Sequence, residues 1–395
     1  MELKREDSSI LPFEIYEKVR RPSTINDSSP KYLETAIGFY QEAIEADHTF
    51  SLAQVGLARC YLSQFRTSKD PKLLQKAMVA AQQAAQLDDN SPDAHRILGE
   101  VYGVAKNKEK SLAELKHTLE LAPNSDAAYR SLGDAYDSSG QGDEAVSAYQ
   151  NAVAANSYFW LNHVTLGTAY LNRGDSATAL AEYQKVTELA VDNPLGYESI
   201  GNIYLREGKW DEAIPQYQKA LALGPDPRIY SQLGTVYFLL KRYDEAVKMY
   251  GNAVEETPGD EILWANLGDT YRRLGQTEKA RATYKRAIVF AKMDEDSQSA
   301  RSLAEIGLLY AKIGDQAQAV QYNPLAHAKA PGDVELLYTE GQLYVLLGQR
   351  AKAITAFRQA IAMGYSRHEM WNDPENAKMQ SLPEFVKLCT TNTTK

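Results

Sequence analysis

The chain has 395 residues, which is too many for one ordinary hydrophobic core, so its length predicts two or three domains or an array of repeats. The net charge of −9 argues against a general nucleic-acid binder or a protein of acidic membrane surfaces. The composition of 44% hydrophobic residues with only two cysteines excludes a disordered chain and a disulfide-stapled mini-protein. Neither a membrane-spanning run nor an apolar signal core is apparent, and we expect a cytoplasmic protein.

From the N-terminus onward, one pattern recurs along most of the chain. It is centred on glycines that are spaced by 33 or 34 residues, with one spacing of 39: Gly99, Gly133, Gly167, Gly201, Gly234, Gly268, Gly307 and Gly341. A tyrosine follows each glycine at the third position, and an alanine follows at the twelfth in seven of the eight copies. The sixteenth position is usually aromatic. An earlier copy, GLARCYL, has Ala58 in place of the glycine, and a partial copy precedes it, so the chain holds about ten copies.

Each copy predicts two helices of about 12–15 residues, because apolar residues recur at helical spacing in two runs with a turn between them. Proline pairs such as Ser91-Pro92 and Asp226-Pro227 mark helix starts. A glycine inside a helix costs about 1 kcal/mol relative to alanine. We therefore expect each glycine to allow close approach of the partner helix at the alanine twelve residues later. The tyrosine at the third position is expected to fill the gap between hairpins, with its hydroxyl on a polar partner.

The 34-residue period of Leu-Gly, Tyr, Ala, aromatic and terminal Pro resembles the tetratricopeptide repeat (TPR) family over residues 31–365. The resemblance implies an all-α, right-handed superhelical solenoid of about ten antiparallel helix pairs, with a concave groove that holds a partner protein or peptide. It divides the chain into a partly flexible N-terminal segment (1–30) with a possible damaged first helix, the solenoid (31–365), a C-terminal helical cap (366–388) and a disordered tail (389–395).

Stretches such as WLNHVTLGTAY and the ending GYSRHEMWNDPENAKMQSLPEFVKL are also similar to TPR regions of bacterial signalling proteins, including serine/threonine kinases and winged-helix regulators. That resemblance implies an alternative function, in which the chain is a sensory or regulatory region separated from its effector domain.

Two departures from the repeat pattern limit which properties of the family we expect in this chain. Pro324 falls in the middle of a predicted helix, so we expect the superhelix to bend or loosen near residues 292–330. The places at which the family's carboxylate clamp needs basic and Asn residues hold Arg96, Glu100, Arg130 and Asp134. The clamp is therefore not expected in this chain.

Motifs of catalysis are missing from the sequence. There is no phosphate-binding GxxxxGK[ST] loop, no HRD or DFG string, and no histidine pair at metal-binding spacing. Asp294, Asp296 and Glu305 have the spacing of a calcium loop, but Ser299 stands where the loop requires glycine, so a solvated loop is the better interpretation. Cys60 is expected in the core. We therefore expect no enzyme, no cofactor and no metal.

The inward face of the first helix in each copy is the candidate binding surface. Its residues are expected six and three positions before the glycine and one and four positions after it. The candidates that line the groove are Leu161, Val164, Leu171, Leu195, Glu198, Asn202, Phe238, Ile262, Asp269 and Arg272. An exposed apolar strip favours binding of a partner. The alternative, left open here together with the oligomeric state, is that these side chains pack across the groove or onto another segment of the same chain.

Overall fold

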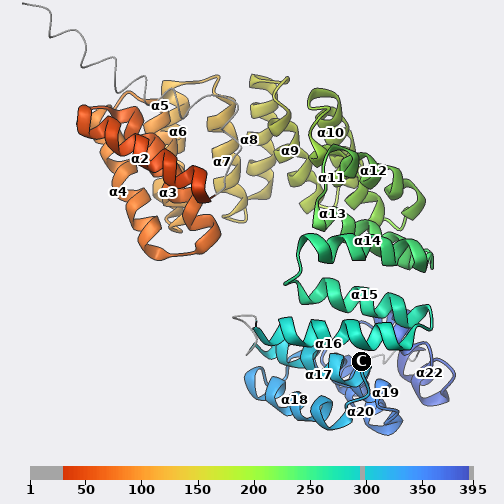
Figure 1. The fold of residues 1–395 in the computed structure, drawn as a ribbon. Helices are drawn as coiled ribbons and strands as arrows, with labels where there is room; N and C mark the ends of the chain where they lie inside the picture. Colours follow the sequence, from red (N-terminus) through yellow and green to blue (C-terminus); the bar gives the residue numbers. More distant parts are fainter. Residues whose placement is uncertain (1–29, 294–298, 391–395) are drawn as a thin grey trace, which may run out of the picture. The chain divides into compact units, whose positions relative to one another are not determined.

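The computed structural model describes residues 30–293 and 299–390. Within these ranges the chain is helical, with no β-strand, and consecutive helices pack against each other as antiparallel pairs (Figure 1). The chain divides into two compact units, Met1–Gly196 and Tyr197–Lys395, which are called here the N-terminal and the C-terminal unit. The predicted all-α solenoid of helix pairs is confirmed.

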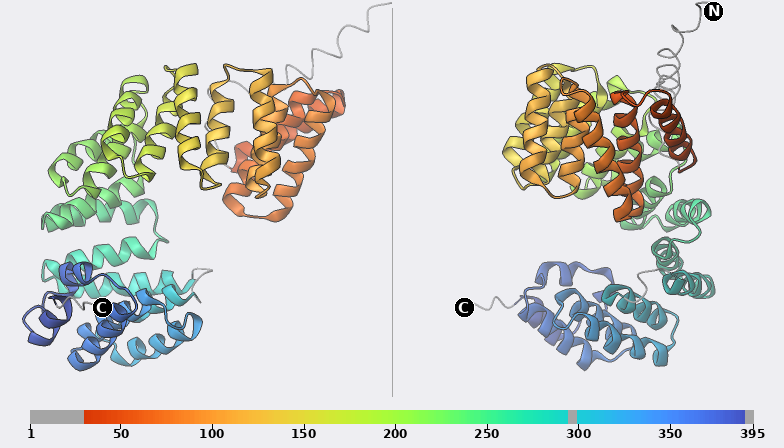
Figure 2. Two further views of the ribbon diagram at one scale, coloured as in Figure 1. Left: turned by 180° about the vertical axis from the view of Figure 1, so that it is seen from behind. Right: turned by 90° about the vertical axis from the view of Figure 1, so that its left-hand side faces the viewer.

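The N-terminal unit begins its described part with a single helix and continues with four hairpins, and each helix lies beside its neighbour in sequence (Figure 2). The helices are α2 (Pro30–Ala46), α3 (Ser51–Ser68), α4 (Pro71–Leu87), α5 (Pro92–Val104), α6 (Lys108–Leu121), α7 (Asp126–Asp137), α8 (Gly142–Ala155), α9 (Trp160–Asn172) and α10 (Ser176–Leu189). The pairs are α3–α4, α5–α6, α7–α8 and α9–α10.

Helix α11 (Pro194–Arg206) spans the boundary between the units. The C-terminal unit continues with α12 (Trp210–Leu223), α13 (Pro227–Leu239), α14 (Tyr243–Glu256), α15 (Glu261–Arg273), α16 (Thr277–Met293), α17 (Ala300–Lys312), α18 (Gln316–Lys329), α19 (Val334–Leu346) and α20 (Arg350–Ala362). It ends in short elements, α21 (Arg367–Asn372), the 3₁₀ turn η1 (Pro374–Asn376) and α22 (Pro383–Thr390). The last helix thus extends two residues past the predicted end of the cap.

The helix starts follow the predicted capping chemistry. The side chain of Ser91 accepts a hydrogen bond from the amide of Ala94, and that of Asp226 accepts one from Arg228, with proline next in sequence in both cases. Between the helices of a hairpin, the turn residue adopts a left-handed conformation, such as Gly174 at φ 81°. These local signals define the hairpin without any tertiary contact.

The helix contact of the repeat glycine differs from the prediction. A Cβ added at Gly201 would lie 2.7 Å from Cε1 of Tyr217, the aromatic residue sixteen positions later, and four other copies with tyrosine there show the same neighbour. The expected partner, the alanine at the twelfth position, is buried, but its side chain is not what approaches the glycine. The glycine therefore makes room for an aromatic ring, and the Gly–Ala assignment was wrong.

The tyrosine three positions after the glycine lies between hairpins as predicted. Its hydroxyl accepts a hydrogen bond from a glutamine in the second helix of the preceding hairpin in three copies: Gln82 to Tyr102, Gln150 to Tyr170 and Gln218 to Tyr237. In the copy of Ala58, Tyr61 accepts the same bond from Gln41 of the preceding helix α2. Lysine or arginine side chains lie over several of these rings, as Lys110 does over Tyr102. This position therefore connects successive hairpins.

The expected loosening is visible at α18, although part of the stretch, residues 294–298, lies outside the described residues. Helix α18 runs through Pro324, and it meets α19 over less of its length than α4, α6, α8, α12, α14 and α16 meet the helices that follow them. The contact is polar, because Asn323 and His327 both hydrogen bond to Glu340. A proline that lacks an N–H and the absence of an aromatic residue at position 323 weaken this junction.

Candidate interaction surface

Five consecutive hairpins share one hydrogen bond that ties the predicted inward face to the core. The buried tyrosine sixteen positions after the glycine bonds the residue directly after the glycine. The pairs are Tyr149–Asp134 at 2.7 Å, Tyr183–Thr168 at 2.9 Å, Tyr217–Asn202 at 2.7 Å, Tyr250–Thr235 at 2.9 Å and Tyr284–Asp269 at 2.6 Å. The candidate residues Asn202 and Asp269 are therefore already partners of a core tyrosine.

The inward side of the N-terminal unit carries a polar part on α5 and α7. Glu100 accepts hydrogen bonds from Arg96 at 2.6 Å and from Ser131 of the next hairpin at 2.8 Å. Burial raises the pKa of Glu100, but Arg96 and Ser131 outweigh it and leave that pKa below its ordinary value. Arg130 pairs with Asp126 and also donates to Asn162. Arg96 and Arg130 are thus both paired with carboxylates of their own helices.

The apolar part of the N-terminal unit lies on α9 and at the start of α11. Leu161, Val164, Leu171 and Leu195 are all half-buried. Half-burial fits both alternatives for these residues, packing within the unit and contact with a partner. Three of the four, those on α9, recur at helical spacing, so the structure brings them onto one side of a single helix.

The candidates on α11, α13 and α15 of the C-terminal unit have different environments. Glu198 is only 7% exposed, and its burial raises its pKa, because Arg228 at 3.7 Å offsets that effect only in part. Phe238 packs edge-on against Tyr243, with ring centres 5.5 Å apart. Ile262 is 53% exposed. These three residues do not form one cluster with Asp269 and Arg272.

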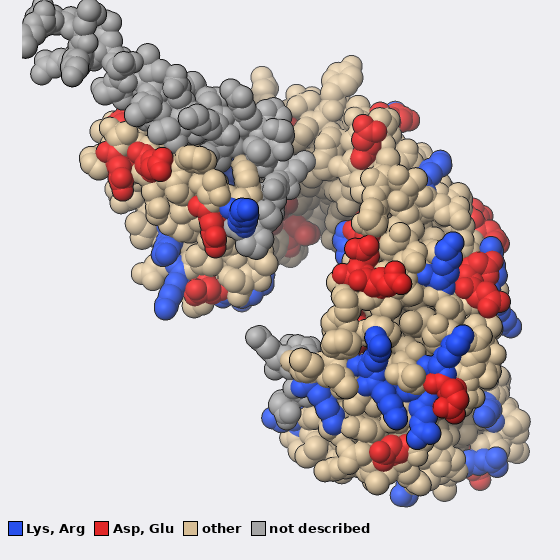
Figure 3. All heavy atoms as spheres, in the orientation of Figure 1, with Lys and Arg blue, Asp and Glu red and all other residues tan. Residues whose placement is uncertain are grey.

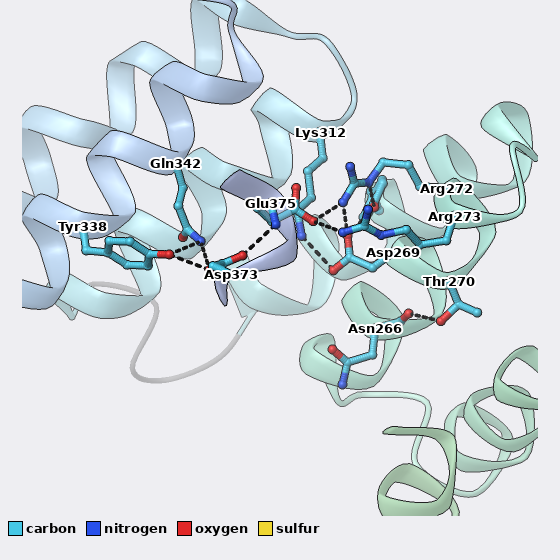
Figure 4. A network of polar contacts seen from close by, with 11 residues as sticks. Asn266, Asp269, Thr270, Arg272, Arg273, Lys312, Tyr338, Gln342, Asp373 and Glu375 are labelled. Carbon is cyan, nitrogen blue, oxygen red and sulfur yellow. Dashed lines mark hydrogen bonds and ion pairs between the residues drawn. The ribbon is translucent and has the colours of Figure 1, made fainter. Parts of the chain in front are cut away.

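Asp269 and Arg272 instead belong to an ionic network between α15 and α17 (Figure 4). Asp269 accepts hydrogen bonds from Tyr284 at 2.6 Å and from Lys312 of α17 at 2.8 Å. Burial alone raises the pKa of Asp269, but Lys312, Tyr284 and Arg272 together hold it below its ordinary value. At Asp134, the matching position in α7, burial prevails and the pKa is raised. Lys312 bonds Asp269 directly, whereas the Glu100 carboxylate near Asp134 adds to the effect of burial there.

The segment after α21 reaches this network from about a hundred residues further along the chain. Glu375 of η1 pairs with Arg272 and with Arg273, the latter at 3.4 Å. Two residues earlier, Asp373 accepts hydrogen bonds from the Tyr338 hydroxyl at 2.6 Å and from the Gln342 amide at 2.8 Å, both on α19 (Figure 4). The backbone segment Asp373–Glu375 therefore presents two carboxylates to the first helices of two hairpins.

Basic side chains gather over α16 on the face of the C-terminal unit that Figure 3 shows. The exposed cations of this helix are Lys279, Arg281, Lys285, Arg286 and Lys292, and Glu278 is its one acidic residue. Lys279 and Arg286 lie over the rings of Tyr271 and Trp264 of α15. In a chain of net charge −9, this helix gives the C-terminal unit a positive field on one face.

Comparison with known proteins identifies the repeat. Family models described as TPR repeat or tetratricopeptide repeat match residues 128–156, 163–185, 201–241, 227–260, 259–323 and 334–363. The chain belongs to the tetratricopeptide repeat family. These models describe the repeat itself, so the similarity to TPR regions of signalling proteins stays a prediction.

Solved structures of TPR proteins resemble parts of the chain. The crystal structure of MamA is 27% identical over 41% of this chain and 92% of its own, with a TM-score of 0.34. The C-terminal part of a TPR repeat-containing protein from Cytophaga hutchinsonii is 17% identical over 61% of this chain and 97% of its own, with a TM-score of 0.48. A TPR protein from Parabacteroides merdae is 15% identical over 76% and 99%, with a TM-score of 0.48. A search of curated proteins gives no match.

Other kinds of site receive no support from the described part of this TPR chain. Within it, no cluster of three His, Cys, Asp or Glu side chains could hold a metal ion, and no helix is long and apolar enough to cross a bilayer. Asp294 and Asp296 of the calcium-like spacing lie outside the described residues. Cys60 is buried as predicted, and its burial raises the thiol pKa to about 11.

Sequence reasoning missed Tyr338, Gln342, Arg273, Lys312, Asp373 and Glu375 as parts of one cluster. Tyr338 and Gln342 occupy the third position before and the first position after Gly341, which belong to the expected inward set of the TPR helix. A usable signal existed in the Asp373-Pro374 pair, which marks the start of a turn. The Asp373 side chain accepts from the amide of Glu375 at 2.7 Å.

Proposed function

We propose that this chain is a non-catalytic protein-interaction scaffold whose inward helix faces hold a peptide or helix of a partner protein. Membership of the TPR family supports the scaffold, because a stack of hairpins displays many first helices along one side. The observation that carries the partner site is the row of half-buried apolar residues on α9, Leu161, Val164 and Leu171, joined by Leu195. Apolar side chains at the edge of a helical face are the usual contacts for a partner helix or peptide.

The test pairs partner capture with stability. The variant Leu161→Ser/Leu171→Ser and the wild-type chain are immobilised, lysate from the native cells is passed over each, and retained proteins are identified by mass spectrometry. Val79→Ser is the matched control, since Val79 is an exposed apolar residue on α4, the second helix of its hairpin. Contact residues usually contribute about 2 kcal/mol or more each to binding.

The expected result is that a protein retained by the wild type and by Val79→Ser is lost from the double variant, with little change in its thermal melt. If the side chains are core instead, the substitutions cost about 2–5 kcal/mol each and the melting temperature drops. A large drop, or undiminished capture by the double variant, would contradict the proposed site.

A further inference from the structure

Inward positions of two helices in the C-terminal unit, Arg272 on α15 and Tyr338 and Gln342 on α19, are occupied by the chain itself, together with the adjacent Arg273. Asp373 bonds Tyr338 and Gln342, and Glu375 bonds Arg272 and Arg273. Four hairpin residues on two different first helices thus hold one short segment through side chains alone, as they would hold a bound peptide. Met370 and Phe385, which flank the segment, are fully buried against α19 and α20, so the cap places the segment there.

The charges around the segment indicate what this surface recognises. Arg272, Arg273 and Lys312 contribute three cations, and Asp269 is the one carboxylate that α15 and α17 place among them. The carboxylate of Glu375 supplies the second anion. Without Glu375, the two partly exposed arginines would leave a net positive surface, which attracts an anionic side chain.

The geometry of the segment adds specificity. Asp373 caps the η1 turn, so its carboxylate and that of Glu375 point to different helices although only one residue separates them. The carboxylate of Asp373 accepts hydrogen bonds from the Tyr338 hydroxyl and the Gln342 amide, and the carboxylate of Glu375 pairs with two guanidinium groups. A ligand that fits both places needs two acidic side chains in an Asp-x-Glu spacing.

We propose that the inward surface formed by Arg272, Arg273, Tyr338 and Gln342 is a binding site for an acidic peptide with the spacing Asp-x-Glu, and that Asp373–Glu375 occupies it until a partner's peptide replaces it. This inference rests on the proposed scaffold function and names the partner class of one surface. The segment Asp373–Glu375 is part of the same chain as the site, so its effective concentration there is of roughly millimolar order. A free peptide must therefore compete with it for the site.

The experiment asks whether the site accepts the segment in trans. A fluorescein-labelled peptide of residues 370–377, acetylated and amidated at its ends, is titrated with the full chain, and binding is followed by fluorescence anisotropy. The opened variant is Asp373→Asn/Glu375→Gln, which removes both negative charges and so weakens the hold of the four hairpin residues on the segment, while the introduced asparagine can still cap the turn. A second variant adds Arg272→Gln/Arg273→Gln. The control peptide carries the same two neutral substitutions as the opened variant.

The opened variant is expected to bind the acidic peptide at least about tenfold more tightly than the wild type, with affinity that falls as salt rises. The control peptide and the variant without the arginines should both lose this binding. Circular dichroism melts establish that each variant is folded; if the opened variant is not, Glu375→Gln alone opens the arginine half and must still bind better than the wild type. A folded opened variant that binds no better than the wild type overturns the proposal. The scaffold test above depends on α9 and partner capture, so either can fail without the other.

Discussion

Replacing a repeat glycine by alanine tests the packing of the hairpins at the level of single atoms. At Gly201 an added Cβ would lie 2.7 Å from Cε1 and 2.9 Å from Cδ1 of Tyr217. Ordinary carbon contacts are about 3.5–4.0 Å, so the ring or the helix must move by roughly 1 Å. The ring is fully buried and its hydroxyl donates a hydrogen bond to Asn202. Both the surrounding side chains and this hydrogen bond therefore oppose the movement of the ring.

The magnitude follows from two opposing contributions. Glycine to alanine within a helix stabilises by about 1 kcal/mol through helix propensity. Overpacking of a close contact costs about 1–3 kcal/mol. At 2.7 Å we expect the clash to prevail, and Gly201→Ala should destabilise by up to about 2 kcal/mol. Gly251, in the interior of α14, is the matched control, because no heavy atom lies within 4 Å of its added Cβ. Gly251→Ala should therefore stabilise by about 1 kcal/mol.

The assay is urea unfolding followed by circular dichroism at the helical signal. The expected result is an opposite displacement of the two midpoints, downward for Gly201→Ala and upward for Gly251→Ala. A graded series sharpens the test, since the clearance falls from 3.2 Å at Gly167 to 3.0 Å at Gly234 and 2.2 Å at Gly341. If Gly201→Ala unfolds at the same urea concentration as Gly251→Ala, or if the series shows no order with clearance, the aromatic contact does not explain the glycines.

Two further predictions concern the C-terminal unit. Lys312, Tyr284 and Arg272 hold the pKa of Asp269 below its ordinary value, against the effect of burial. The ionised carboxylate therefore stabilises the fold above the ordinary carboxyl pKa of about 3.9, and this stability is lost as the pH falls through the lower native pKa. The wild-type melting temperature should therefore fall more between pH 7 and pH 3 than that of Asp269→Asn. The pKa of Asp134 is raised, so acid favours its native state, and the melting temperature of Asp134→Asn should fall at least as much as that of the wild type. An equal fall in wild type and Asp269→Asn would contradict this. Truncation after Gly364 removes Met370 and Phe385 from the core around Phe357, so the shortened chain should bind more hydrophobic dye than the full chain, and unchanged dye fluorescence would remove the cap assignment.

The hairpins were predictable because their signals are local and repeated. The spacing of glycines, the capping residues and the turn glycines all act within one copy, and the structure places helices where they indicate. The interhairpin role of Tyr102 and its equivalents was also predictable, since an aromatic ring with a polar end suits a gap between two helical layers.

The partner of the glycine was missed for a geometric reason. In an antiparallel hairpin the residue twelve positions after the glycine lies at about the same level, which made alanine the natural choice. Helical side chains, however, lean toward the N-terminus of their own helix, so a long side chain covers the surface one turn before its own backbone. Tyr217 starts one turn further along α12 and its ring returns to the level of Gly201.

The contact of the C-terminal segment could not be read from any periodic pattern, because Arg272 and Glu375 are 103 residues apart. The sequence does predict which inward residues are engaged by a tyrosine of their own hairpin. Wherever the sixteenth position is tyrosine, its hydroxyl engages the residue after the glycine, as Tyr284 engages Asp269.

Three of the glycine-centred copies lack this hydroxyl, those of Gly99, Gly307 and Gly341, and the residue after the glycine is polar in the first and the last of them. Leu115 stands at the sixteenth position of the copy of Gly99, and there Glu100 bonds Ser131 of the next hairpin. Phe357 stands at that position in the copy of Gly341, and there Gln342 bonds Asp373 of the C-terminal segment. In these two copies the inward polar side chain makes its contact outside its own hairpin without a core tyrosine, whereas Asp269 contacts both Tyr284 and Lys312 of the next hairpin. The inner surface of this TPR chain is therefore not uniform: the middle copies use it to fix their own tyrosines, and the last copy uses it to hold an acidic segment.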